Sequence, residues 1–205
     1  MTALPSSLFA DAAFFRALRS VVAPQLRTWP YANVWLVGCG TGEQAFAIAI
    51  ALREEGLFGR IRLHATEVED APLSRAREAT YPASTLAVAH QRYVDGGGRA
   101  SLVDYLIEKD EVVTVCEDVR QQIVFAQHSP DIGGSFAEQQ LIVCRGALGR
   151  FALPQRRRAW SLLHDSLCRF GLLAVDRAES LSDHPQRGSY EAVDALHGVY
   201  RRGDA

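Results

Sequence analysis

The sequence has no excess of basic residues. Its 22 lysine and arginine residues are balanced by 24 aspartate and glutamate residues, which leaves a formal net charge of −2. Lys109 is the only lysine, so arginine carries nearly all of the positive charge. Proteins that bind nucleic acid usually present a basic face, and this balance argues against that class. We therefore expect no nucleic-acid partner.

Long apolar runs and paired cysteines are also missing. No stretch holds the roughly 18 uninterrupted apolar residues that a membrane helix needs, and residues 1–10 do not resemble a leader peptide. The four cysteines form no C-x-x-C pair, and the histidines show no metal-ligand spacing. We expect a cytoplasmic protein with reduced thiols, no membrane insertion and no metal.

What the sequence does contain is a strand, a glycine loop and a helix close to its start. The apolar run Val34–Val37 is followed by Gly38, Gly40 and Gly42, and then by the apolar segment Ala45–Leu52. Glycines allow a sharp turn and a close approach to a ligand, because they carry no Cβ. This arrangement is typical of the first unit of a nucleotide- or cofactor-binding α/β domain, although a purely structural turn remains an alternative.

Further strands and helices alternate along the chain. The expected strands are Val34–Gly38, Ile61–Thr66, Ile123–His128, Gln140–Cys144, Leu172–Val175, Tyr190–Ala195 and Leu196–Arg202. The expected helices are Leu8–Leu26, Thr41–Glu55, Ala71–Thr80 and Pro154–Phe170. This order predicts an α/β fold with a mostly parallel, Rossmann-like sheet covered on both faces. Residues 1–30 would form an N-terminal helix packed on a domain of residues 31–205.

The alternation breaks at about residues 81–122. Gly96–Gly98 interrupts the chain there, and the strand-like pieces Leu102–Ile107 and Val112–Cys116 follow, joined by a polar turn. We interpret this stretch as a small antiparallel subdomain inserted into the α/β domain. An irregular crossover connection is the alternative.

Two carboxylates are expected beside the glycine loop, because ligands of such sheets lie at the carboxyl ends of the strands. Glu67 ends the second expected strand, where its carboxylate could accept both hydroxyls of a ribose. Glu43 begins the first helix, where it would repel a pyrophosphate but could pair with an ammonium group. Glu43 and the G-x-G-x-G spacing favour S-adenosylmethionine over a nicotinamide cofactor, which stays a more distant alternative.

Several short motifs along the chain together resemble the chemotaxis receptor methyltransferase family. They are Phe14-Phe15-Arg16, Gly38-Cys39-Gly40-Thr41-Gly42-Glu43, Ala65-Thr66-Glu67-Val68, Tyr81-Pro82, Val124-Phe125, Cys144-Arg145, Ala178-Glu179-Ser180-Leu181 and Val199-Tyr200-Arg201. The similarity spans roughly residues 14–202. Members of the family transfer the methyl group of S-adenosylmethionine to glutamate side chains of chemoreceptors. The resemblance implies S-adenosylhomocysteine as the product, a protein substrate such as a chemoreceptor, and a small subdomain that docks a receptor tail in some members.

The resemblance also implies roles for residues of the cofactor site. Gly38, Gly40 and Thr41 would approach the cofactor, and Glu43 would meet its amino group. Glu67, followed by Val68, would take the place of the aspartate that binds the ribose in the family. Ser129 and Pro130 fall where the family has an Asn-Leu pair beside the adenine. Arg145 and Gly146 fall on the family's Arg-Asn pair.

Two arginines are the candidate catalytic residues. Arg16 matches the arginine of the F-F-R motif near the methionine end of the cofactor, and Arg150 stands where the family has a tyrosine near the transferring methyl. Methyl transfer to a carboxylate mainly needs proximity and orientation rather than a general base. Two arginines that face one pocket would hold an acidic acceptor.

Some residues depart from the family pattern. Gly146 and Ser129 each replace an asparagine, Arg150 replaces the tyrosine, and most of the family's N-terminal helical domain has no counterpart in this sequence. Lost buried hydrogen bonds of about 0.5–1.5 kcal/mol each would weaken cofactor binding. The alternative to an enzyme is therefore a degenerate, non-catalytic relative that binds a partner in a signalling complex.

Overall fold

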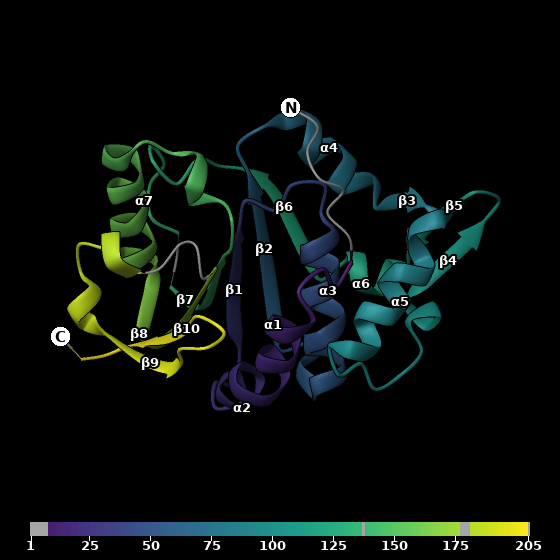
Figure 1. Ribbon diagram of the computed structural model, residues 1–205, viewed down its shortest axis with the longest axis horizontal. Coiled ribbons are helices and arrows are strands. Elements are labelled where there is room, and N and C mark those ends of the chain that lie inside the picture. The colour runs from purple at the N-terminus through teal and green to yellow at the C-terminus, as the bar shows by residue number, and fades with distance from the viewer. Residues whose placement is uncertain (1–7, 137, 177–180, 205) are drawn as a thin grey trace.

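The computed structural model describes residues 8–136, 138–176 and 181–204. Its centre is a seven-stranded sheet in the order β6-β2-β1-β7-β8-β10-β9 (Figure 1). The strands are β1 (Ala32–Val37), β2 (Ile61–Glu67), β6 (Ile123–Gln127), β7 (Gln139–Cys144), β8 (Leu167–Val175), β9 (Tyr190–Asp194) and β10 (Val199–Arg202). β10 runs antiparallel to both of its neighbours, and the other neighbouring strands pair in parallel. The predicted mostly parallel α/β sheet is confirmed.

The central strands are apolar on both faces because helices cover both faces. In β1, Val34 and Leu36 pack into one hydrophobic cluster, whereas Trp35 and Val37 pack into another on the opposite face. Near-continuous apolar runs of this kind are typical of parallel strands buried on both sides. The carboxyl end of β1 therefore emerges from the middle of the sheet, between β2 and β7.

The two faces carry different helices (Figure 1). One face is covered by the N-terminal helices, by α3 and by α4, and the other by α7. Their bounds are α1 (Ala12–Ala17), α2 (Ala23–Leu26), α3 (Glu43–Leu52), α4 (Asp70–Glu78) and α7 (Leu153–Ser166), with π-helical turns at Leu18–Val22 and Arg53–Leu57. Within the described ranges, no helix is long and apolar enough to cross a membrane.

A second, three-stranded antiparallel sheet lies beside α3 and α4, at the end of the molecule away from α7 (Figure 1). It is built from β3 (Thr80–Pro82), β5 (Val112–Val115) and β4 (Leu106–Lys109), accompanied by α5 (Leu86–Asp95) and α6 (Glu117–Arg120). The strand expected over Val112–Cys116 is present as β5, and β3 adds a strand that was not expected. The strand expected over Leu102–Ile107 is wrong for most of its length, because Ser101 and Asp104 form a capping box that starts a 3-10 turn, and β4 begins only at Leu106. Short 3-10 turns lie at Ala83–Thr85, Leu102–Tyr105, Leu148–Arg150, Leu181–Asp183 and Arg187–Ser189.

One predicted helix ends earlier than the sequence pattern indicates. The helix expected over Pro154–Phe170 stops at Ser166, and Leu167 already pairs with Gln139 at the start of β8. Gly171 lies within β8, beside Phe170, which has a φ of 62°. Pairing with β7 outweighs local helix preference here, because strand formation depends on neighbouring strands.

Candidate cofactor site at the carboxyl ends of the strands

The glycine loop after β1 turns through three left-handed residues. Gly38, Gly40 and Gly42 have φ values of 72°, 54° and 92°, which residues with a Cβ rarely adopt. The Gly38 N–H donates to the carbonyl oxygen of Thr66 at 2.8 Å, which fixes the loop to β2. A Cβ on Gly42 would come within 2.9 Å of the Ala76 Cβ, whereas the space beside Gly40 is open. The loop is therefore packed at Gly42 and accessible at Gly40.

Glu67 ends β2 with a carboxylate that the loop and its own backbone hold in place. One oxygen, Oε2, accepts a hydrogen bond from the Gly40 N–H at 2.9 Å, and Oε1 accepts one from the Val68 N–H at 2.7 Å. The residue is only 3% exposed. Burial raises the pKa of this carboxyl, but the two N–H groups and the neighbouring Arg150 outweigh burial, and the pKa lies below its ordinary value. Glu67 is therefore an ionised acceptor at physiological pH.

Arg150 forms an ion pair with the same carboxylate. Its Nη2 lies 3.0 Å from Glu67 Oε1, and its Nη1 lies 3.8 Å from Oε1 of Glu69. Arg150 ends the 3-10 turn that follows β7, and this segment lies close to the glycine loop. A Cβ on Gly38 would be 2.7 Å from the Ala147 Cβ, so only glycine permits this approach. The 83-residue separation between Glu67 and Arg150 explains why the sequence did not reveal their pairing.

Glu43 occupies the first turn of α3 and is nearly buried, with 8% of its surface exposed. It accepts a 2.6 Å hydrogen bond from the Thr41 hydroxyl, and the Thr41 carbonyl oxygen accepts one from the Tyr81 hydroxyl. Burial, and then the Glu67 and Glu43 carboxylates, raise the pKa of the Cys39 thiol to about 12. A second carboxylate thus lies at this edge of the sheet, and the loop thiol is not a nucleophile at neutral pH.

Ser129 and Pro130 follow β6 in a turn that is tied to the start of α7. The Ser129 hydroxyl donates to Asp131, and the second Asp131 oxygen accepts from the Gln155 side chain at 3.0 Å. Pro130 lines a shallow groove of about 390 Å³ together with Ile132 and residues of α7. The adenine-side role that the resemblance implies for this turn stays a prediction.

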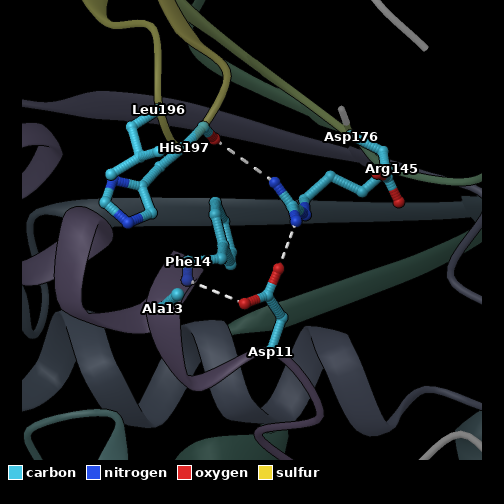
Figure 2. A pocket seen from close by; sticks show the side chains of 7 residues that line it. All are labelled: Asp11, Ala13, Phe14, Arg145, Asp176, Leu196 and His197. Atoms are coloured by element: carbon cyan, nitrogen blue, oxygen red, sulfur yellow. Dashed lines mark hydrogen bonds and ion pairs between the residues drawn. The ribbon is translucent and has the colours of Figure 1, made fainter. Parts of the chain in front are cut away.

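Arg145 follows β7 and contacts other residues at the carboxyl ends of the strands (Figure 2). Its guanidinium pairs with Asp11, donates to the Val175 carbonyl oxygen at 2.9 Å and lies 4.4 Å from the ring centre of Phe14. Gly146 beside it has a φ of 78° and open space at its Cβ position. Arg145 therefore joins the N-terminal helix to the end of β8.

A cavity of about 340 Å³ opens beside Arg145 (Figure 2). Its walls are Asp11, Ala13, Phe14, Arg145, Asp176, Leu196 and His197. The Nδ1 of His197 lies 2.7 Å from a carboxylate oxygen of Asp194, in the turn between β9 and β10. Phe14 and Arg145 were singled out in the sequence as motif residues, but the cavity that they line was not predicted. Asp11 also carries a local signal, because it precedes the helix as a capping residue and accepts from the Phe14 N–H at 3.0 Å.

The two candidate catalytic arginines contact different parts of the molecule. Arg16, on α1, donates to the carbonyl oxygen of Asp95 at the end of α5, whereas Arg150 pairs with Glu67 at the end of β2. In the structure the two side chains thus have different partners, and a catalytic role for Arg16 stays a prediction.

These residues suit S-adenosylmethionine by their donor and acceptor chemistry. Glu67 could offer its ionised carboxylate to a ribose, Glu43 could offer its carboxylate to an ammonium group, and the space beside Gly40 is open. The Gly40 N–H already donates to Glu67, so the loop and the carboxylate form one rigid unit. The Arg150 guanidinium occupies Glu67 Oε1, and its side chain is 43% exposed.

Solved structures share this fold. The glycopeptide N-methyltransferase MtfA complexed with sinefungin has a TM-score of 0.52 and 13% identity, covering 85% of this chain and 51% of that chain. The same protein complexed with S-adenosyl-L-homocysteine has a TM-score of 0.50 and 14% identity, and the match covers 85% of this chain and 50% of that chain. At such identities the likeness concerns the fold alone. The sheet is that of a class I S-adenosylmethionine-dependent methyltransferase.

Sequence relatives carry more specific names. A Pseudomonas putida protein provisionally named methyltransferase Cher3 is 34% identical over 197 residues, which are 96% of this chain and 72% of that protein. The chemotaxis protein methyltransferase of Listeria innocua is 27% identical over 151 residues, covering 73% of this chain and 54% of that one. The chain thus spans between 54% and 72% of the length of these two relatives.

The family comparison agrees with these relatives. Residues 5–195 match the family described as the CheR methyltransferase, in its S-adenosylmethionine-binding domain. This match extends over most of the chain and includes the glycine loop, Glu67 and Arg145. The chain therefore belongs to the CheR methyltransferase family and contains its S-adenosylmethionine-binding domain.

Proposed function

We propose that this chain transfers the methyl group of S-adenosylmethionine to a carboxylate side chain of a protein. The observation that carries the proposal is the buried, ionised carboxylate of Glu67 at the carboxyl end of β2, held by the N–H of Gly40. It gives the ribose an acceptor at the position where sheets of this kind bind cofactors. Family membership supplies the reaction class.

S-adenosylmethionine supplies a methyl group on a positively charged sulfur, which makes that carbon electrophilic. An oxygen of the acceptor carboxylate forms the new bond to carbon while the carbon–sulfur bond breaks and its electron pair stays on sulfur. The acceptor carries no proton at neutral pH, so the protein needs to orient it rather than deprotonate it. Arg150 is the group that we assign to this task, because it is a partly exposed cation at the site.

The departures from the family pattern are compatible with catalysis. Gly146 has a φ of 78°, a conformation that asparagine also tolerates, so the family's asparagine and this glycine suit the same backbone. Ser129 supports its turn through Asp131 rather than leaving a gap. The alternative of a non-catalytic partner-binding module is less favoured, because the chain retains both site carboxylates and its relatives are named as methyltransferases.

A protein acceptor follows from the names of the relatives, and a chemoreceptor or another signalling protein is the partner that we propose. The small sheet offers a place for such a partner, since β4 is its edge strand and Ile107 on it is 59% exposed. An edge strand can pair with an extended segment of another protein.

Calorimetric titration with S-adenosylmethionine and S-adenosylhomocysteine tests the proposal. Wild-type protein should bind both compounds with micromolar dissociation constants. Glu67→Gln should weaken binding by about 10–100-fold, because it removes the charged acceptor of the ribose hydroxyls. Glu69→Gln is the matched control, since its side chain is 70% exposed, and it should bind like wild type. Failure of wild type to bind either compound at millimolar concentration would refute the proposal.

A further inference from the structure

Arg150 competes for the carboxylate that we assign to the ribose of the cofactor. The Oε1 atom of Glu67 already accepts the Val68 N–H at 2.7 Å, Nη2 of Arg150 at 3.0 Å and, at a longer 3.4 Å, the Glu69 N–H. A carboxylate oxygen surrounded by three donors has little capacity for a further one. A ribose hydroxyl can therefore reach Oε1 only when the guanidinium leaves it.

The Arg150 guanidinium is the mobile partner of this pair. Glu67 is fixed from two sides by backbone N–H groups and its side chain is only 4% exposed. The Arg150 side chain is 43% exposed, and its second contact is a 3.8 Å approach to the exposed Glu69. A half-exposed ion pair of this kind is weak and is screened by salt. Cofactor binding can displace it.

We propose that Arg150 is a switch residue that the cofactor releases toward the acceptor. In the structure Arg150 neutralises Glu67. When ribose hydroxyls take over Glu67, the guanidinium becomes available to a carboxylate of the acceptor, close to the glycine loop. The chain then binds its cofactor first and its acidic acceptor second. This inference rests on the proposed methyltransferase function.

The position of Arg150 in the fold supports this exchange. Ala147, in the same short segment, touches Gly38, so the base of the Arg150 side chain is anchored beside the cofactor loop. The charged end, whose side chain is 43% exposed, can therefore turn away from Glu67 without movement of the sheet. Arginine suits both partners, because its planar guanidinium pairs with carboxylates in two-point contacts.

Titration of S-adenosylhomocysteine into variants tests the first half of the proposal. Arg150→Met keeps most of the side-chain volume but removes the competing charge, and it should bind the compound about 3- to 10-fold more tightly than wild type. Arg62→Met is the matched control, because Arg62 is an exposed arginine on the same strand as Glu67, and its affinity should not change. Equal or weaker binding by Arg150→Met would overturn the proposal.

Salt provides a second readout on the same proteins. Raising NaCl from about 0.05 M to about 0.5 M screens the half-exposed pair. The affinity of wild type for S-adenosylhomocysteine should then approach that of Arg150→Met, and the difference between the two proteins should shrink. A difference that stays constant across this range would contradict competition by the ion pair.

The order of binding is tested with N-acetyl-L-glutamate as the carboxylate probe, detected by saturation-transfer NMR. Wild type should show the probe signal only with saturating S-adenosylhomocysteine, and Arg150→Met should lose it. A signal of equal strength without the nucleoside, or no signal in either state, would overturn the second half of the proposal. If wild type and Arg150→Met both fail to bind S-adenosylhomocysteine, the proposed function itself fails. If both bind it equally, only the switch fails.

Discussion

The hydroxyl of Tyr81 donates a 2.9 Å hydrogen bond to the carbonyl oxygen of Thr41. This contact joins β3 of the small sheet to the glycine loop of the cofactor site, across 40 residues of sequence. Burial, and then the nearby Glu43 carboxylate, raise the pKa of Tyr81, so the hydroxyl keeps its proton and remains a donor. The small subdomain thus supports the loop directly.

Replacing this hydroxyl should affect both stability and cofactor binding. Tyr81→Phe should lower the free energy of unfolding by about 1 kcal/mol, because a part-buried hydrogen bond is lost. Binding of S-adenosylhomocysteine should weaken about 3-fold as Thr41 loses its support. Tyr31→Phe is the control, since Tyr31 is 49% exposed. Urea denaturation and calorimetry measure the two effects, and unchanged affinity in Tyr81→Phe would show that the contact does not support the loop.

A buried ion pair fastens the N-terminal helix to the rest of the chain. Nη2 of Arg19 lies 2.7 Å from a carboxylate oxygen of Glu54, and the two side chains are only 5% and 4% exposed. The Arg19 Nε also donates to the Gly96 carbonyl oxygen at 3.1 Å. Arg19→Met should cost about 3 kcal/mol of unfolding free energy, because it leaves a buried carboxylate without its cation.

The control for this prediction is Arg53→Met. Arg53 pairs with Asp118 at 3.4 Å, but the Asp118 side chain is 69% exposed. Loss of such a surface pair should cost less than about 1 kcal/mol. Both values come from urea denaturation, and similar costs for the two variants would contradict the prediction.

The pH dependence of stability should report a buried histidine. Burial, and then repulsion from His164, lower the pKa of His184 from 6.5 to about 4. The neutral ring accepts a 3.0 Å hydrogen bond from the Gln186 N–H at Nδ1, which protonation would abolish. Between pH 6.5 and about 4 the unfolded chain binds more protons than the folded one, so stability falls as the pH falls through this window.

His184→Phe removes this titration and keeps the ring contacts with Trp160 and Tyr190. Wild type should lose about 2 kcal/mol more than His184→Phe between pH 7 and pH 4.5. His90→Gln, an exposed control, should behave like wild type. Urea denaturation across this pH range makes the measurement. Parallel pH profiles for wild type and His184→Phe would exclude a lowered pKa at His184.

The turn into β10 should not tolerate any side chain at Gly198. This residue has a φ of 70°, and a Cβ would come within 2.3 Å of the Val175 carbonyl oxygen. Gly198→Ala should therefore cost about 3–5 kcal/mol. Gly56 has a similar φ of 77° but open space around it, so Gly56→Ala should cost only about 1–2 kcal/mol. Thermal or urea denaturation measures the loss of unfolding free energy in both variants. Equal losses would show that the positive φ alone, and not the contact with Val175, sets the cost of a side chain.

Much of the fold could be predicted because its signals are local. A parallel sheet is indicated within a few residues by the apolar run of β1, by the glycines after it and by Glu67 at the end of β2. The boundary between α7 and β8 could not be predicted, because Leu167 joins a strand only through its partner Gln139. The site residues of the loop followed from the same local pattern.

The α/β class, the cofactor loop and the family resemblance are evident in the sequence alone, since they depend on periodicity and on short motifs. The partners of the arginines depend instead on how the chain folds. Arg150 meets Glu67 across 83 residues, Arg145 meets Asp11 across 134, and Arg16 turns toward α5. A long side chain contacts whichever elements the fold places near it, so its partners depend on packing rather than on spacing along the chain.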